Sequence, residues 1–216
     1  MPALDGLGPA IAIALLLVVM LWFTFGTQRN IRRGNELLTW LQGGLPRLGP
    51  RTTLRWFGSS AVELTIVEPA GPFRDATIVV VLEPRDVGLL WAFARSRGRR
   101  DFIIIRTNLR QAPRISADVG DPTGWTGRLD PPEETGLRRE AWEGGITAEL
   151  DRATDQRPVR DAWLRIGAAS GGIWRLTIQP VVPHLEVHVL PPDRRSVAAG
   201  PLIEAVTDLA TDLTRR

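Results

Sequence analysis

Residues 9–25 read PAIAIALLLVVMLWFTF, seventeen residues without a charge, and Leu7 and Gly8 extend the uncharged run toward the N-terminus. At about 1.5 Å of helical rise per residue, this run nearly covers the roughly 30 Å hydrocarbon core of a bilayer. A buried helix of a globular protein ordinarily carries a polar stripe over five turns, and none is present here. The stretch therefore predicts one membrane-spanning helix, with residues 9–26 in contact with the lipid bilayer.

A cleaved signal peptide is the second interpretation of the same run. Such a peptide needs a positively charged start, a shorter apolar segment and small residues at the cleavage site. Asp5 is the single charge before the run, and bulky Trp22, Phe23 and Phe25 stand where small residues would be required. The sequence favours an anchor that is retained.

The flanking charges indicate the orientation of this helix. Arg29, Arg32 and Arg33 follow the span, whereas no arginine precedes it. Positive residues near a span favour the cytoplasmic side. We therefore expect a single-pass protein of the cell membrane with its N-terminus outside and its C-terminal domain in the cytoplasm.

The composition excludes several chemistries. All 27 basic residues are arginines, and the chain has no lysine, cysteine or tyrosine. This rules out a phosphate-binding loop with lysine, Schiff-base chemistry, a thiol nucleophile, disulfides and cysteine-held metals. The arginine bias is typical of a GC-rich prokaryotic genome; selection for bidentate binding of phosphate or carboxylate is the alternative.

Charge is unevenly distributed along the chain. Residues 27–114 carry a net charge of +8, whereas residues 115–216 carry −4. The half next to the span is thus suited to face anionic lipid headgroups, and the distal half to face solvent or a partner.

After an anchor over residues 1–28, the pattern predicts an α+β fold with an antiparallel sheet. Residues 29–51 are expected to form a short juxtamembrane helix, over 30–42, and a linker. Alternating or β-branched stretches predict strands over 61–67, 76–82 and 102–105, and the spacing of Val87, Leu90, Trp91 and Ala94 predicts an amphipathic helix over 86–97. Residues 52–114 would then form a first βββα(β) unit.

Residues 115–161 differ in composition from the strand-rich segments on either side, with eleven acids, six glycines and four prolines. We expect an acidic, Gly/Pro-rich surface insertion with short helices at most. Residues 162–216 return to strands, over 162–166, 173–179 and 185–190, followed by a helix over 201–214.

The two strand-rich stretches share an order of elements, which raises the hypothesis of a duplication. Leu64-Thr65-Ile66 matches Leu176-Thr177-Ile178, at an offset of 112. Two βββα units, with their helices packed on one face of the sheet, would satisfy the need of each apolar face to be covered. Coincidence among common strand residues explains the match equally well.

A run of arginines is the candidate binding site. Arg95, Arg97, Arg99 and Arg100 cluster at the expected helix end, and Arg106 and Arg110 follow. Arginine offers bidentate donors to anions, although cations at a helix C-terminus are also favourable without any ligand. The anion would be phosphate, nucleic acid or the headgroup of an anionic lipid; nucleic acid is the least favoured, because Trp91 and Phe93 are expected in the core and not as stacking platforms.

The sequence predicts neither a catalytic nor a metal-binding group of residues. His184, Glu186 and His188 alternate along a strand, which places the two histidines roughly 13 Å apart, too far to share one ion. We expect them on the solvent face. The loop acids lack the spacing of a calcium site, and no G-x-S-x-G surrounds a serine. The acids and serines in question are Asp118, Asp121, Asp130, Glu133, Glu134, Ser59, Ser60 and Ser170.

We therefore expect no metal and no cofactor, and we do not expect an enzyme. The leading functional hypothesis is a membrane-tethered interaction module that binds another protein or a second copy of itself. The first alternative is an arginine-rich domain that binds lipid headgroups or nucleic acid. A hydrolase that works through the carboxylates of residues 115–161 is the weaker alternative.

Overall fold

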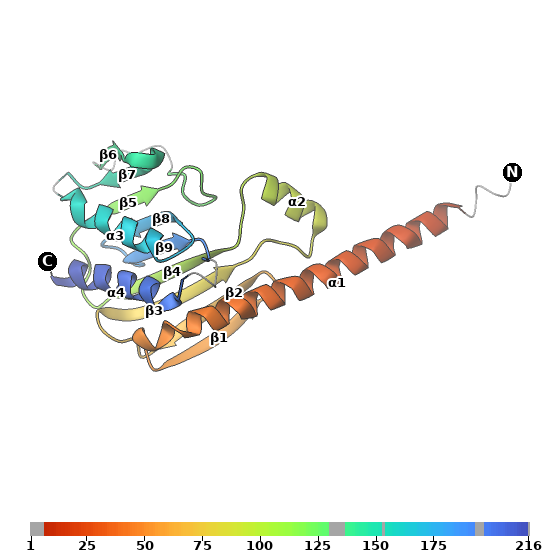
Figure 1. Ribbon diagram of the computed structural model, residues 1–216, viewed down its shortest axis with the longest axis horizontal. Coiled ribbons are helices and arrows are strands. Elements are labelled where there is room, and N and C mark those ends of the chain that lie inside the picture. Colours follow the sequence, from red (N-terminus) through yellow and green to blue (C-terminus); the bar gives the residue numbers. More distant parts are fainter. Residues whose placement is uncertain (1–6, 130–136, 153, 193–196, 216) are drawn as a thin grey trace.

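The computed structural model describes residues 7–129, 137–152, 154–192 and 197–215. The fold is α+β. In the described part of the chain, it combines a nine-stranded antiparallel sheet with a long apolar N-terminal helix, α1 (Leu7–Gln42), and three further α-helices. In Figure 1, α1 extends away from the sheet toward the N-terminus, and the C-terminus lies at the opposite end of the molecule.

The sheet has the strand order β1-β2-β3-β4-β9-β8-β5-β7-β6. Its first four members are β1 (Arg51–Phe57), β2 (Ala61–Val67), β3 (Phe73–Val81) and β4 (Phe102–Leu109). The others are β5 (Ala117–Gly120), β6 (Arg138–Ala141), β7 (Thr147–Leu150), β8 (Ile173–Ile178) and β9 (Leu185–Val189). The strands predicted over 61–67, 76–82, 102–105, 173–179 and 185–190 are thus confirmed, with small shifts at their ends.

Helix α1 is one continuous element of 36 residues, roughly 54 Å long at 1.5 Å per residue. Its first part, residues 7–25, is exposed throughout, whereas from Gly26 onward one face is buried against the sheet. Residues 30–42 are helical, as predicted, but they continue α1 and do not form a separate helix, because nothing interrupts α1 between the apolar run and Gln42. The expected linker contains a short 3₁₀ turn, Leu45–Arg47, whose Leu45 is buried.

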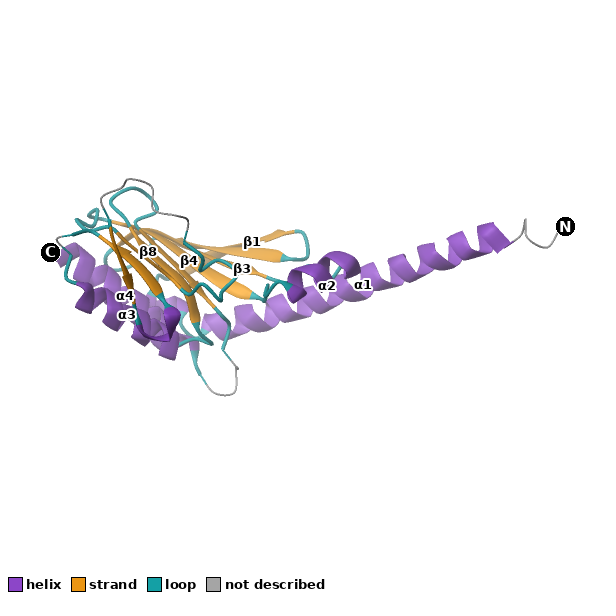
Figure 2. Cartoon of the chain, turned by 90° about the horizontal axis from the view of Figure 1, so that it is seen from above, coloured by secondary structure: helices purple, strands orange, loops and turns teal. Residues whose placement is uncertain are grey.

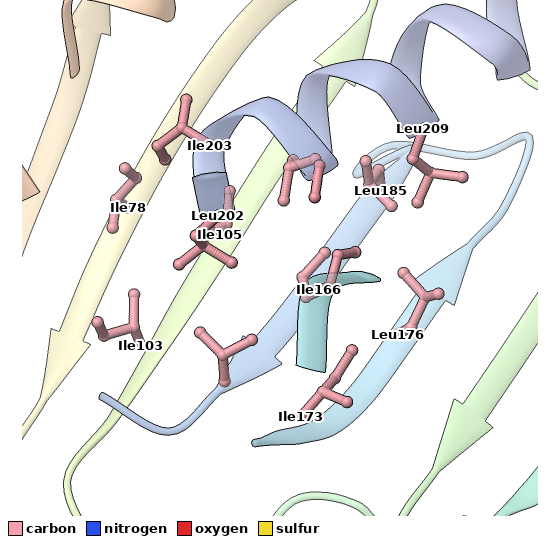
Figure 3. Close-up of a cluster of buried hydrophobic side chains, with 14 of the residues drawn as sticks. Ile78, Ile103, Ile105, Ile166, Ile173, Leu176, Leu185, Leu202, Ile203 and Leu209 are labelled. Carbon is pink, nitrogen blue, oxygen red and sulfur yellow. The ribbon is translucent and has the colours of Figure 1, made fainter. Parts of the chain in front are cut away.

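Three helical segments cover one face of the sheet. These are the second part of α1, α3 (Gln156–Ala168) and α4 (Ala199–Arg215), and Figure 2 shows α3 and α4 on one side of the strands. The helix expected over 201–214 is α4. Alternate residues of the central strands, such as Ile103 and Ile105, meet Leu202 of α4 and Ile166 of α3 in the core (Figure 3).

The opposite face of the sheet is largely polar. A small apolar cluster of Phe102, Ile104 and Trp174 lies there, with Gly124 packed on the Trp174 ring. A row of polar residues also crosses neighbouring strands at directly paired positions: Thr65, Thr77, Arg106, Glu186, Thr177 and Asp118.

The segment over 115–161 is not the surface insertion that we expected. Its described residues include β5, β7 and β6, which extend the sheet beyond β8, and the first turns of α3. Each of the three strands has four residues and therefore offers few apolar side chains to reveal a pattern. The pairing of β5 with β8 is also distant in sequence and leaves no local signal.

The strand predicted over 162–166 is wrong as well, because these residues lie in α3. Ala162, Trp163 and Ile166 are buried at helical spacing, and the Asp155 side chain caps the helix by accepting a hydrogen bond from the backbone N–H of Arg157. Because residues 162–216 begin with a helix in place of the expected first strand, they do not show the duplicated βββα unit.

Candidate membrane-surface site

The exposed part of α1 contacts the segment around α2 (Gly88–Ser96). The Trp22 indole donates a hydrogen bond to the carbonyl of Arg85 at 3.0 Å, and its ring centre lies 6.3 Å from that of Trp91 in α2. Two glycines permit the approach. A Cβ at Gly26 would lie 2.1 Å from the Arg85 carbonyl oxygen, and one at Gly88 would lie 2.8 Å from the Trp22 ring.

Behind this contact, a buried polar residue joins α1 to the sheet. Asn30 is fully buried, and its amide donates to the Glu83 carbonyl at 3.0 Å and to the Ser60 hydroxyl at 3.2 Å. Its side-chain oxygen accepts a hydrogen bond from Arg85 at 3.1 Å. Asn30 thus has partners for its donors and for its acceptor, as a buried amide requires.

Two buried carboxylates extend the network. Glu83 is 2% exposed and accepts hydrogen bonds from Arg95 at 3.0 Å and from the Trp91 indole. Asp101, 8% exposed, accepts from Arg85 at 3.0 and 3.1 Å and from the backbone N–H of Glu83 at 2.8 Å. Leaving such a carboxylate buried without its partner is strongly destabilising. The network therefore fixes α1, α2 and the start of β4 relative to one another.

A basic hollow of about 560 Å³ opens beside this network, at the end of the apolar run. Arginines predominate among the charged residues of its lining, which comprises Phe25, Gln28, Arg29, Arg32, Arg33, Glu36, Arg85 and Asp101. Arg33 pairs with Asp101 at 3.3 Å, whereas Arg29 and Arg32 are exposed and make no ion pair with any residue that the structure describes. The hollow is therefore suited to an anion such as a phosphate group.

The predicted arginine cluster is brought together only in part. Arg95 pairs with Glu83, the Arg97 guanidinium lies 4.4 Å from the centre of the Phe93 ring, and Arg99 lies 5.9 Å from that of Trp125. Arg100 donates to the carbonyls of Arg95 and Arg99. These four arginines lie around the C-terminal end of α2, and we refer to them as the arginine collar.

Arg106 and Arg110 lie elsewhere. Arg106 is on the open sheet face and pairs with Glu186, and Arg110 donates to the carbonyls of Pro69 and Gly71. At about 3.3 Å per residue, β4 places Arg110 roughly 25 Å beyond Phe102. One small ligand therefore cannot contact both Arg110 and the collar.

The helix predicted over 86–97 is confirmed as α2, but its aromatic residues are not the core residues that we expected. Phe93 is 55% exposed and Trp91 is half-buried against Trp22, while Ala94 is the buried residue of the helix. The apolar face of α2 thus points away from the sheet. Periodicity alone cannot tell which medium covers an apolar face.

The histidines are buried, contrary to expectation. His184 is 8% exposed and its Nδ1 accepts a hydrogen bond from the backbone N–H of Leu109, while His188 is 7% exposed and lies 2.6 Å from a Glu186 oxygen. Burial raises the pKa of Glu186, but the hydrogen bonds with His188 and Arg106 outweigh it and lower that pKa to about 2. Among the described residues, no group of three or more potential ligands could hold a metal ion.

The remaining candidates do not converge on one site. Asp118 accepts hydrogen bonds from Arg175 and Thr177 on the open sheet face, and Asp121 accepts two from Thr123, through its backbone N–H and its hydroxyl. The serines serve local contacts: Ser59 donates to Asp86, Ser60 accepts from Asn30, and Ser170 donates to a carbonyl of α3. Asp130, Glu133 and Glu134 lie outside the described residues.

Comparison with known proteins adds no function: no family model matches the chain, and no curated protein is similar to it.

The basic hollow is the part of this site that sequence reasoning missed. Phe25, Arg29, Arg32, Arg33 and Glu36 are spaced to lie along one side of a helix, which was the available signal. Gln28 also belongs to α1, whereas Arg85 and Asp101 come from just before α2 and just after it. The contribution of these last two residues depends on how the connection from β3 to β4 folds back onto α1, which no local pattern encodes.

Proposed function

We propose that the chain is a single-pass membrane protein whose α+β domain acts, without catalysis, as an interaction module at the cytoplasmic surface of the cell membrane. One observation carries this proposal: α1 is both the apolar helix and a core element of the domain. Among the described helices, α1 is the one with the length and composition to cross a membrane, properties that a signal sequence shares. An uninterrupted helix would hold the domain at a fixed distance and angle from the bilayer.

The anchor is tested first by the mass of the protein purified from its own membrane. A retained anchor predicts the mass of the full chain, and release from membranes only by detergent. A protein that begins beyond Phe25, or that washes off at high salt, would contradict the proposal.

The interaction partner is expected to be another protein or a second copy of this chain. The open sheet face is the surface we assign to it, because a hollow of about 500 Å³ lies there between β2, β3, β4 and β9. Its charged lining comprises Glu63, Asp75 and Glu186 against the single Arg106, so a partner with basic side chains would be complementary.

Cross-linking in native membranes tests this assignment. A photo-reactive group at Thr77, which lines this hollow, should capture a discrete partner or a second copy. The matched control is Leu164, an exposed residue on α3. Equal cross-linking from both positions, or a monomer with no adduct from Thr77, would count against the interaction module.

Binding of anionic lipid headgroups is the second candidate function, and the basic hollow at the end of the span favours it. Arg29 and Arg32 lie just beyond the apolar run of α1, which ends at Phe25, at the level expected for a headgroup phosphate. Each arginine near an anionic surface contributes about 1 kcal/mol. The Arg29→Gln/Arg32→Gln variant should therefore lose about 2 kcal/mol and bind phosphatidylglycerol about thirtyfold more weakly.

Native mass spectrometry of the full chain in detergent, titrated with phosphatidylglycerol or phosphatidylcholine, measures this effect. The control is Arg114→Gln/Arg152→Gln, which removes the same charge from two exposed arginines without an ion pair in the described part of the chain. An equal loss in both variants would show a general charge effect and would contradict a specific headgroup site.

A further inference from the structure

The outer face of α2 is apolar and uncovered. Leu89 is 90% exposed, Phe93 is 55% exposed and Leu90 is 49% exposed. They lie on one side of the helix, because Phe93 follows Leu90 by three residues and Leu89 by four. A contiguous apolar patch of this kind on a protein surface indicates contact with another apolar medium.

The patch lies next to the apolar helix. Figures 1 and 2 both place α2 beside α1, and the Trp22–Trp91 contact joins the two helices three residues before the uncharged run ends at Phe25. A small hollow between them is lined by residues of both helices, among them Trp22, Phe25 and Trp91. Because every residue from Leu7 to Phe25 is exposed, the apolar surface of α1 continues onto α2.

Arginines border this apolar surface on both helices. The arginine collar lies at the C-terminal end of α2, and Arg29 and Arg32 follow the apolar run in α1. The Arg97 guanidinium stacks on the Phe93 ring, so a charged group borders the apolar face directly. An apolar helix face bordered by arginines is typical of a helix that lies in the interface of a membrane.

We propose that α2 is a second membrane contact: its outer face inserts into the leaflet that α1 enters, with Leu89, Leu90 and Phe93 among the acyl chains and the arginine collar among the headgroups. A bilayer explains what a partner protein would not, namely that the patch continues onto the spanning helix and is bordered by arginines on both helices. The ion pair of Arg95 with buried Glu83 and the hydrogen bond from Trp91 hold α2 in this position. The domain is then fixed at two points and cannot rotate about α1.

This inference rests on the proposed membrane anchor, and the experiment separates the two. The chain has no cysteine, so single cysteines can carry a spin label in the full-length protein, reconstituted in nanodiscs of phosphatidylcholine and phosphatidylglycerol. The labelled variants are Val19→Cys in α1, Leu89→Cys and Phe93→Cys in α2, and Leu164→Cys as an exposed apolar control on α3. Collision with oxygen, which partitions into lipid, is compared with collision with a water-soluble nickel complex.

We expect the ratio of oxygen to nickel collisions at Leu89 and Phe93 to exceed that at Leu164 several-fold and to approach that at Val19. A ratio at Leu89 and Phe93 equal to that at Leu164, with a high ratio at Val19, would overturn the α2 contact and leave the anchor standing. Labels on α2 that neither reagent reaches would identify a protein partner or second copy, and would also overturn it. A low ratio at Val19 would instead contradict the anchor itself.

Because a cysteine can perturb a short helix, a second variant tests the same contact. Leu89→Asp/Phe93→Asp places two charges on the outer face of α2, away from the buried Ala94. With a label at Leu90→Cys, this variant should lose the lipid-like collision ratio that Leu90→Cys alone shows. An unchanged ratio would contradict insertion.

Discussion

Asp101 connects α1 to the segment before α2 within the buried network, because it accepts hydrogen bonds from Arg33 and Arg85. It is 8% exposed and pairs with Arg85, whose side chain is 13% exposed, so both charges are largely removed from water. Removing one member of a buried pair costs about 3–5 kcal/mol, because the remaining charge is left without its partner. Arg85 would keep Glu83 at 3.6 Å and Asn30 at 3.1 Å as partners. We therefore expect Asp101→Ala to lower the free energy of unfolding by about 3 kcal/mol, the lower end of this range, measured in detergent by tryptophan fluorescence in guanidinium.

The control for this prediction is Asp75→Ala, which removes an exposed aspartate paired with Arg74 at 3.3 Å. Exposed pairs contribute about 0–1 kcal/mol. Similar losses for the two variants would contradict the buried network.

The lowered pKa of Glu186 predicts that the free energy of unfolding depends on pH in a specific way. Its pKa falls from an ordinary value of 4.5 to about 2 in the folded protein, so between these values the unfolded chain binds a proton that the folded chain does not. The contribution of Glu186 is therefore complete above about pH 4.5 and is lost as the pH falls toward 2. Because solvent screens the pair, we expect Glu186→Gln to cost about 1–2 kcal/mol at pH 7.

The measurement is guanidinium unfolding of wild type and Glu186→Gln from pH 7 to pH 2. The stability difference should shrink below pH 4.5, and most of it should be gone at pH 2. Glu204→Gln, at an exposed position of α4, serves as the control and should show a small difference throughout. A constant difference for Glu186→Gln over the whole range would show that its neighbours do not stabilise the carboxylate.

Single residues are harder to predict from the sequence than elements are. Alternation places Glu186 and His188 correctly on one side of a strand, but it does not predict the burial of His188. The Phe102 ring that lies beside His188 comes from β4, more than eighty residues earlier in the chain. Likewise, the arginine collar is visible as a run of arginines, whereas the pairing of Arg95 with Glu83 depends on how α2 folds back.

At the scale of elements, the junction between α1 and residues 85–88 depends on two glycines. A side chain at Gly26 would collide with the backbone of Arg85, and overpacking of this kind costs about 1–3 kcal/mol, partly offset by the roughly 1 kcal/mol that alanine gains over glycine within a helix. We expect Gly26→Ala to lower the unfolding midpoint in guanidinium and to change the tryptophan emission, because Trp22 would move away from Trp91 and from the Arg85 carbonyl.

Gly8→Ala is the matched control, because it lies in the same helix and a Cβ there meets nothing within 4 Å. It should leave the midpoint unchanged. If Gly26→Ala also left the midpoint and the emission unchanged, α1 would not pack closely on this segment.

Long, strongly patterned elements are predictable from this sequence, and short ones are not. The apolar run, β2, β3 and α4 carry their period over many residues, whereas β5, β6 and β7 have four residues each and depend on pairing with distant strands. The strand expected over 162–166 is wrong because these five residues are apolar except for Arg165, a composition that suits a buried strand as well as a helix. The helical period of α3 becomes visible only when Val159 is included.

At the scale of the whole molecule, α1 joins its apolar end to the domain without a flexible link. Its exposed part is roughly 28 Å long, close to the apolar thickness of a bilayer, and its second part is buried under the sheet. With α2 as a second contact, the open face of the sheet would be presented at a fixed angle to the membrane, where a partner could reach it.

The most direct test of the membrane-anchored arrangement is cysteine labelling in intact cells. A cysteine is introduced at Ala3 or at Asp212, an exposed residue of α4, and the cells are treated with a membrane-impermeant maleimide before and after lysis. The arrangement predicts that Ala3→Cys is labelled in intact cells and that Asp212→Cys is labelled only after lysis. Labelling of Asp212→Cys in intact cells would contradict a cytoplasmic domain behind a single membrane-spanning helix.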